Sequence, residues 1–359
     1  MTKKESEYFM GKLNSIKNSL LDILNNISFS NDSDFQFIGN HISKKNIMDK
    51  LKSPFSPELI MKDINDNYNY YKKYVFTYNQ IIIKIIILNN IPNINLKDII
   101  IMGLKGITFI NEFVQYSTVT LYYIPTNYKK QLSNTSNIEP INTNSGFTTT
   151  GISNPYICIY REEEHDKVFL HELIHYLYLD FHTFQMEDID IKSMKNYDYE
   201  IMNPLINHVN LFETYTDFMA IVYNSMINSI IHNQSVIDIL NLELIYQTDR
   251  ACMILDKFGM DHIIKEKKTK NKNKKLKQST NVLSYYILKT ALTDNYMDVF
   301  LKFKLGDTWT KDKINFFYSY IYDTLSNKIF VNSVIDKTYR YEKKKYVNND
   351  TMKMTLMYS

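Results

Sequence analysis

The sequence predicts an α+β protein dominated by helix, in which a small mixed sheet packs on two central helices between helical N- and C-terminal regions. Three observations predict this class. Glycine and proline are scarce, with 8 and 7 among 359 residues, which favours long helices over a turn-rich all-β fold. Apolar residues recur at steps of three and four over much of the chain. Short β-branched and aromatic runs fall between residues 118 and 160.

The overall composition is that of a folded protein with balanced charge. Hydrophobic residues make up 44% and charged residues 23%, which excludes a wholly disordered chain. The formal net charge of +3 is too small for a general nucleic-acid or membrane-surface protein. The most apolar run, residues 81–88, contains Lys84 and is far shorter than the ~20 residues that cross a bilayer. We therefore expect no membrane partner.

Two features predict a cytoplasmic protein. Its two cysteines, Cys158 and Cys252, cannot form a disulfide framework, which indicates a reducing compartment. The first seven residues contain no apolar stretch of the kind found in a secretory signal.

The first predicted region, residues 1–117, is expected to be helical. Apolar side chains in residues 7–27 follow the helical period and predict an amphipathic helix. Two further helices are expected at residues 59–90 and 96–116. Residues 30–55 are polar, and we expect loop and short pieces there.

The second region, residues 118–232, is the predicted core. Three strands are expected in it, at residues 118–124, 146–150 and 156–160, before the chain becomes helical again. The third region, residues 233–359, is expected to be helical with a lysine-rich loop at 265–278. That loop lacks the arginines and interleaved aromatic rings typical of nucleic-acid contacts, so nucleic acid is not an expected partner.

The most informative motif is His-Glu-x-x-His, formed by His171, Glu172 and His175. On a helix, positions i and i+4 lie one turn apart on the same face, so both imidazoles can bind one ion. Glu172 is then placed to reach a water molecule on that ion. The acidic run at residues 162–164 precedes the motif and suits the positive end of a helix.

A catalytic zinc site needs three protein ligands and a place for water. Asp180 and His182 follow His175 closely and are alternatives for the third ligand. A second apolar helix, expected at residues 204–231, carries Glu213 and Asp217 at i and i+4. Two carboxylates on such a helix need a cation or hydrogen-bond donors to compensate them. We expect Glu213 to bind the metal and Asp217 to accept the free ring N–H of a ligating histidine.

The combination His171-Glu172-x-x-His175 and Glu213-x-x-x-Asp217 resembles the gluzincins, the thermolysin-type zinc metallopeptidases. The stretches 144–148 and 159–164 before the motif also resemble uncharacterised metallopeptidase-like proteins of giant DNA viruses. The resemblance covers about residues 118–232 and implies one Zn²⁺ ion, with Glu172 as general base and Asp217 paired with His171. The gap before Glu213 is longer than in thermolysin, which implies an inserted segment at about 183–203.

These features predict zinc-dependent hydrolysis of a peptide bond in a polypeptide substrate. A donor to the developing oxyanion is also needed, and four residues are considered for it: Tyr176, His208, Tyr285 and Tyr286. A strand from residues 144–150 or 156–160 is expected to pair with the extended substrate. The alternative is a catalytically inactive metallopeptidase-like scaffold that acts as a zinc-binding structural or interaction protein, for instance in a virion.

Overall fold

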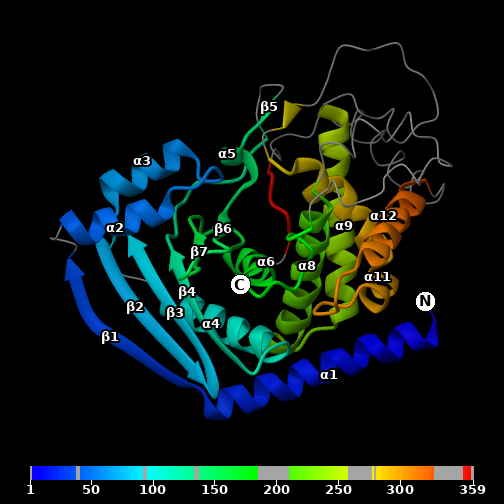
Figure 1. The fold of residues 1–359 in the computed structure, drawn as a ribbon, viewed down its shortest axis with the longest axis horizontal. Coiled ribbons are helices and arrows are strands. Elements are labelled where there is room, and N and C mark those ends of the chain that lie inside the picture. The colour runs from blue at the N-terminus through cyan, green and yellow to red at the C-terminus, as the bar shows by residue number, and fades with distance from the viewer. Residues whose placement is uncertain are drawn as a thin grey trace.

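The structure, a computed structural model, describes residues 2–37, 41–91, 95–132, 137–184, 210–257, 277–278, 280–326 and 351–356. Helices and one mixed sheet dominate these residues, so the predicted helix-rich α+β class is confirmed (Figure 1). Most of the expected lysine-rich loop and of the expected inserted segment lies outside the described residues. Among the described helices, none has an apolar stretch long enough to cross a membrane.

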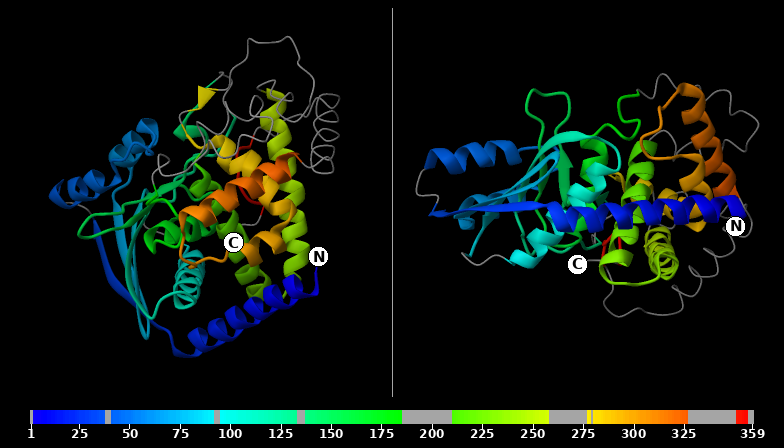
Figure 2. Two further views of the ribbon diagram at one scale, coloured as in Figure 1. Left: turned by 45° about the vertical axis from the view of Figure 1, so that its right-hand side comes forward. Right: turned by 90° about the horizontal axis from the view of Figure 1, so that it is seen from below.

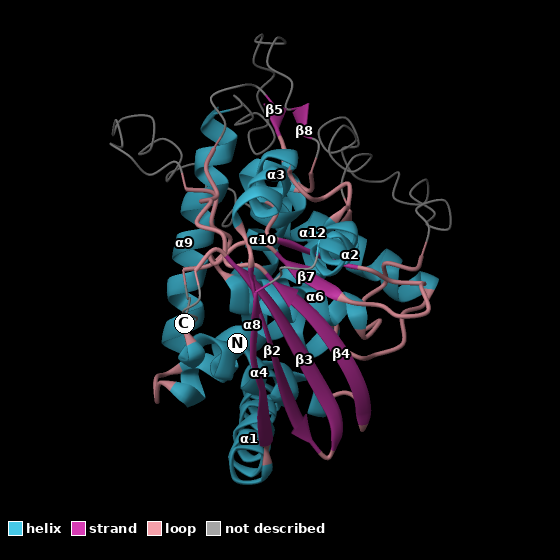
Figure 3. Ribbon diagram, turned by 90° about the vertical axis from the view of Figure 1, so that its left-hand side faces the viewer, coloured by secondary structure: helices cyan, strands magenta, loops and turns pink. Residues whose placement is uncertain are grey.

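The main sheet of the described chain has six strands in the order β1-β2-β3-β4-β7-β6. Strands β1 to β3 pair antiparallel, β3, β4 and β7 are parallel, and β6 is antiparallel to β7. Figure 3 shows the long strands side by side. The strand bounds are β1 (Ser28–Phe37), β2 (Tyr70–Tyr78), β3 (Gln80–Asn89), β4 (Tyr116–Tyr123), β6 (Gly146–Thr148) and β7 (Ile157–Ile159), with a separate parallel pair of β5 (Asn137–Ile138) and β8 (Lys277–Gln278).

The single helix expected over residues 59–90 is wrong. Helix α3 (Glu58–Asn67) covers only its start, and β2 and β3 cover the rest. Asn79, with a left-handed φ of 52°, lies at the tight turn between these two strands. The isoleucines decide the conformation, because alternate ones are fully buried in the sheet, namely Ile81, Ile83, Ile85 and Ile87.

The loop expected at residues 30–55 is also wrong, since most of β1 and helix α2 (His41–Leu51) lie there. The region 1–117, expected to be helical, therefore supplies strands β1 to β3 as well as helices. Helix α4 (Leu96–Asn111) agrees with the helix expected at 96–116. It connects the parallel strands β3 and β4, which a hairpin cannot join.

The other expected helices are present. Helix α1 (Lys3–Asn26) begins at a capping box, in which Thr2 and Glu5 satisfy each other's backbone N–H groups. It runs along α4, α8 and α11 (Figure 2). The remaining helices are α5 (Pro140–Thr143), α6 (His165–Tyr176), α8 (Leu211–Ile231), α9 (Val236–Lys257), the π-helix η4 (Leu283–Leu288), α10 (Lys289–Asp294), α11 (Tyr296–Lys302) and α12 (Lys311–Ser326).

Helices cover both faces of the sheet. Helices α2 and α3 pack on one face with the side chains of Tyr122 and Tyr160, and α4 and α6 pack on the other. Gly106 of α4 lies between the sheet and α6, because a Cβ atom there would stand 2.7 Å from Ile83 and 2.6 Å from Phe169. This close packing holds α6 against the centre of the molecule.

The C-terminal segment 351–356, red in Figure 1, lies between α6 and α9. The backbone N–H groups of Met354 and Thr355 donate to Glu164 at the start of α6, and that of Leu356 donates to Glu243 of α9. Met354 is 5% exposed and belongs to the same hydrophobic core as Phe9 of α1. All three regions of the sequence therefore share one hydrophobic core.

Candidate metal centre

Helix α6 carries the His-Glu-x-x-His motif and is bounded by two left-handed residues. Glu164 precedes it with φ of 61°, and Tyr178 follows it with φ of 55°. Such angles are uncommon for residues other than glycine and must be offset by local bonds. The Glu164 carboxylate accepts from Lys130 Nζ at 2.7 Å and from the N–H of Thr355 at 2.6 Å. These bonds fix the start of the helix.

The three expected ligands meet at one point. His171 Nε2 lies 3.2 Å from His175 Nε2 and 3.2 Å from Glu213 Oε2, and His175 Nε2 lies 3.7 Å from the same oxygen. Atoms at the corners of a tetrahedron ~2.0–2.1 Å from a zinc ion are separated by ~3.3 Å. The three groups could therefore hold a metal ion without rearrangement.

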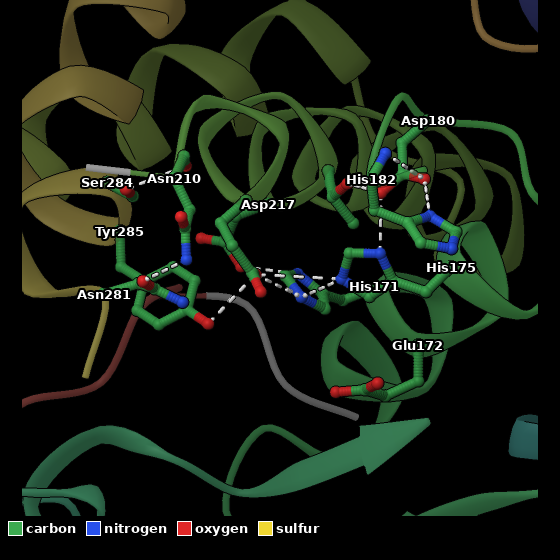
Figure 4. A network of polar contacts seen from close by, with 12 residues as sticks. His171, Glu172, His175, Asp180, His182, Asn210, Asp217, Asn281, Ser284 and Tyr285 are labelled. Atoms are coloured by element: carbon green, nitrogen blue, oxygen red, sulfur yellow. Dashed lines mark hydrogen bonds and ion pairs between the residues drawn. The ribbon is translucent and has the colours of Figure 1, made fainter. Parts of the chain in front are cut away.

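A carboxylate orients each imidazole from its other ring nitrogen. His171 Nδ1 lies 3.1 Å from Asp217 Oδ1, and His175 Nδ1 lies 2.6 Å from Asp180 Oδ2 (Figure 4). With both Nδ1 atoms bonded in this way, both Nε2 atoms are left to face the metal position. Asp217 thus contacts His171 as the motif implies.

Asp180 occupies a different place from the one considered for it. The chain turns at Tyr178, and the Leu179 N–H donates to the Ile174 carbonyl at 3.0 Å. This turn returns the chain toward α6, so that the Asp180 carboxylate contacts the His175 ring. It contacts the Nδ1 atom of this ligand instead of joining Glu213 at the metal position. A left-handed tyrosine leaves no mark in the sequence, so the turn was not foreseeable.

His182 lies on the other side of the same carboxylate. Its Nδ1 atom contacts Asp180 Oδ1, while its Nε2 atom is buried and has no hydrogen-bond partner among the described residues. His175, Asp180 and His182 form a second cluster that could hold a metal ion. In the present geometry this cluster is a chain of hydrogen bonds that positions His175, and Thr216 completes it by donating to Asp180 at 2.8 Å.

The electrostatics of the centre favour a cation. Burial, with the charge of His175, lowers the pKa of His171 to about 3, which keeps this imidazole neutral. Burial also lowers the pKa of His175, but the carboxylates of Asp180 and Glu213 outweigh it and raise that pKa well above its ordinary value. Without a metal, a proton on His175 compensates the buried carboxylates.

Glu172 projects from α6 toward strand β6. Burial raises the pKa of its carboxyl group to about 7, although the charge of His175 and a hydrogen bond from Thr148 oppose the shift. The Thr148 hydroxyl donates to Glu172 Oε2 at 2.7 Å and so fixes the carboxylate. The sequence contained no signal for this contribution of Thr148.

Tyr285 is the one proposed oxyanion donor that the described structure brings to the centre. Its hydroxyl donates to Glu213 Oε2 at 3.0 Å, from the π-helix η4. The π-helical turn rotates Tyr285 toward α8, where it lines the same pocket as the three ligands.

The other proposed donors are not found at the centre. The prediction of Tyr176 as a donor is wrong, because its hydroxyl donates to the carbonyl of Thr118 at 2.7 Å, away from the pocket. Tyr286 is wrong because its hydroxyl donates to the carbonyl of Met352. His208 lies outside the described residues.

Two buried lysines surround Asp217. Lys289 Nζ donates to Asp217 Oδ2 at 2.6 Å, and Lys167 Nζ donates to Oδ1. All three side chains are at most 1% exposed. Lys167 precedes His171 by four residues and so lies on the same face of α6. Its role could have been inferred from that spacing, because a cation one turn from a ligand needs an anion beside it.

A pocket of about 240 Å³ opens between β6, α6, α8 and η4 and contains the candidate ligands in its wall. Strand β6 is the last strand of the sheet, so one of its edges is not paired with another strand in the described chain. Strand β7 lies between β4 and β6, which rules out residues 156–160 as an edge for substrate. Residues 144–150 remain available for that role.

No protein-family model, curated protein or solved structure matches this chain. The likeness to gluzincins and to viral proteins therefore stays a prediction from the motifs.

Proposed function

We propose that the protein is a zinc-dependent hydrolase that cleaves peptide bonds, with Glu172 as general base. The observation that carries the proposal is the convergence of His171, His175 and Glu213 within 3.2–3.7 Å of one another. Two imidazoles and one carboxylate are a donor set that suits zinc, and the spacing suits its tetrahedral geometry. When bound, zinc supplies an electrophile that acidifies a water molecule and polarises the scissile carbonyl.

Glu172 is suited to move the proton. Its carboxylate takes the proton of the attacking water and later delivers it to the leaving nitrogen. A general base works best when its pKa is close to the working pH, and burial brings Glu172 there. The Thr148 hydrogen bond keeps the carboxylate in one orientation during both transfers.

The pocket contains a group that can stabilise the oxyanion. The Tyr285 hydroxyl lies beside the Glu213 ligand and can turn its hydrogen toward a substrate oxygen there. His182 also lines the pocket, and Asp180 fixes its ring.

A polypeptide substrate is supported by the unpaired edge of β6. An extended peptide can add to this edge as a further strand and lie along α6. Thr148 of β6 contacts Glu172, so a peptide on this edge passes next to the general base.

The test compares wild type with Glu172→Gln and with Glu162→Gln, an exposed residue before the same helix. We expect one zinc ion per chain in all three proteins, measured by elemental analysis. Cleavage of a peptide library should fall ~10²- to 10⁴-fold in Glu172→Gln only. Equal cleavage in wild type and Glu172→Gln would contradict the proposal, as would zinc binding without cleavage in any form.

The alternative, a zinc-binding scaffold without activity, is favoured by one observation. The Tyr285 hydroxyl is bonded to the Glu213 ligand instead of standing free for substrate. This reading predicts that Glu172→Gln binds zinc and leaves the biological function of the protein intact, so the same variant separates the two proposals.

A further inference from the structure

The pocket extends beyond the candidate metal centre along α6. Thr148 of β6 lies beside Glu172, and Gly146 lies beside Val168, one helical turn earlier. Strand β6 and helix α6 therefore run in the same direction along the pocket. Residues that precede Gly146 lie next to the beginning of α6, where Lys167 stands.

This second end of the pocket is polar and contains two lysines, with Asp217, the partner of Lys167, in the same wall. It is lined by Lys130, Lys167, Asn144, Ser145 and Met354. Lys130 and Lys167 are each 1% exposed. Lys167 lies two hydrogen bonds from the His171 ligand, through Asp217. A substrate group bound at this end would therefore lie close to a peptide bond positioned at the metal centre.

The polar groups at this end have unused hydrogen-bonding capacity. An ammonium group has three donors. Among the described residues, Lys130 Nζ donates to Glu164 at 2.7 Å and to no other group. The Ser145 hydroxyl is buried and has no partner in the described part of the chain. Unused donors in a buried wall are costly unless a ligand satisfies them.

The counter-ion of Lys130 stands behind the wall. Glu164 does not line the pocket, and the N–H groups of Met354 and Thr355 hold its carboxylate in place. Lys130 therefore lines the pocket while its carboxylate partner does not. An anion that reaches the Lys130 ammonium group would be attracted to it at short range.

We propose that the Lys130 end of the pocket binds a carboxylate of the substrate, which is either an Asp or Glu side chain beside the cleaved bond or the C-terminal carboxylate of the peptide. The identification of the ligand as a peptide rests on the proposed function. Glu164 and Asp217 stand beside the two ammonium groups, so a dianion such as phosphate meets about twice the repulsion of a carboxylate.

The test uses binding, because binding does not require turnover. Labelled hexapeptides carry Glu or Gln at each position in turn, and each is made with a C-terminal acid or amide. Full-length zinc-loaded Glu172→Gln protein is titrated against them by fluorescence anisotropy. We expect roughly 10- to 100-fold tighter binding for one Glu position over Gln, or for the acid over the amide. The pattern shows which source supplies the carboxylate.

Variants of the pocket wall test whether Lys130 causes the preference for a carboxylate. Lys130→Met should bring the acid-to-neutral ratio to about one, since charge-assisted hydrogen bonds supply it. Lys129→Met, the exposed neighbour, should leave the ratio unchanged. If Lys130→Met does not fold, the acid-to-neutral binding ratio of Ser145→Ala and that of the parent protein still test the proposal. A ratio near one in the parent protein, a ratio unchanged in Lys130→Met, or no peptide binding would overturn the proposal.

The two proposals fail separately. A lysine-dependent carboxylate preference without cleavage by the protein with Glu172 intact supports the subsite and counts against hydrolysis. Cleavage that ignores acidic residues and the C-terminal carboxylate supports hydrolysis and overturns the subsite.

Discussion

Replacing Asp217 by Asn removes the anion that joins the buried lysines to the His171 ligand. The side chain is fully buried and accepts from Lys289 at 2.6 Å, from Lys167, and from His171 at 3.1 Å. The amide occupies the same space but carries no charge. The substitution therefore leaves the packing intact and removes the compensation of two buried ammonium groups.

The magnitude follows from that environment. Removing one partner of a buried ion pair lowers the free energy of unfolding by ~3–5 kcal/mol. Burial lowers the pKa of Lys289 to about 7, so at neutral pH this lysine can lose its proton and limit the cost to ~3 kcal/mol. A chain of 359 residues has an unfolding entropy of ~0.75 kcal/mol/K, which converts this cost into a fall of ~4 °C in Tm.

The destabilisation caused by Asp217→Asn should increase as the pH falls. Below a pKa of about 7, Lys289 of the wild type is charged and paired with Asp217, whereas in Asp217→Asn a charge on Lys289 has no anion beside it. Above that pH Lys289 is neutral in both proteins and adds nothing further to the cost of losing Asp217. The difference in Tm between wild type and Asp217→Asn should therefore grow as the pH falls from 8 to 6. Zinc affinity should also fall ~10- to 100-fold, because His171 loses its acceptor.

The assay is thermal unfolding of the metal-free proteins at several pH values, with zinc affinity from competition with a chelating dye. Asp238→Asn, an exposed change on α9, is the matched control. A Tm within about 1 °C of wild type at pH 6 would refute the assigned role of Asp217 in stability. Unchanged zinc affinity would refute its role in orienting His171.

Three further outcomes are expected. Tyr285→Phe should lower the rate of peptide cleavage ~10²- to 10³-fold with zinc content unchanged, and an unaltered rate would remove Tyr285 from catalysis. Burial raises the pKa of Asp166, but the charges of Lys105 and His165 outweigh it and lower the pKa below the ordinary value. The destabilisation of Asp166→Asn should therefore be full above about pH 4 and shrink at lower pH in chemical denaturation, and a constant difference would contradict this. Zinc binding at pH 7 should release about one proton from His175 in the Glu172→Gln protein, measured by calorimetry in two buffers, and a release near zero would contradict its raised pKa.

The sequence was informative where the centre depends on helical spacing. His171 and His175, like Glu213 and Asp217, are separated by one helical turn, and such spacing can be read without knowledge of the fold. The contacts that support them come from other segments. Asp180 arrives through a left-handed tyrosine, and Thr148 comes from a three-residue strand. Neither leaves a periodic signal.

The same distinction explains the errors in the fold. The apolar run at residues 81–88 lies in a strand whose one face is fully buried and whose other face is half-buried, and isoleucines occupy both faces, so its hydrophobicity does not alternate cleanly. Its dense isoleucines then fit a buried helix equally well. Strand β4 was expected correctly because its threonines, tyrosines and valine are strand formers ended by a proline.

The charges around the centre give an argument for a cation that does not depend on the motif. Lysines compensate Asp217, but Glu213 and Asp180 contact no lysine or arginine in the described part of the chain. Among the described residues, imidazoles are their only basic partners, and one of these, His171, is held neutral. A buried and a largely buried carboxylate with so little compensation are costly in a protein interior. A divalent ion held by His171, His175 and Glu213 would remove that cost, which would account for the convergence of acidic residues at this centre.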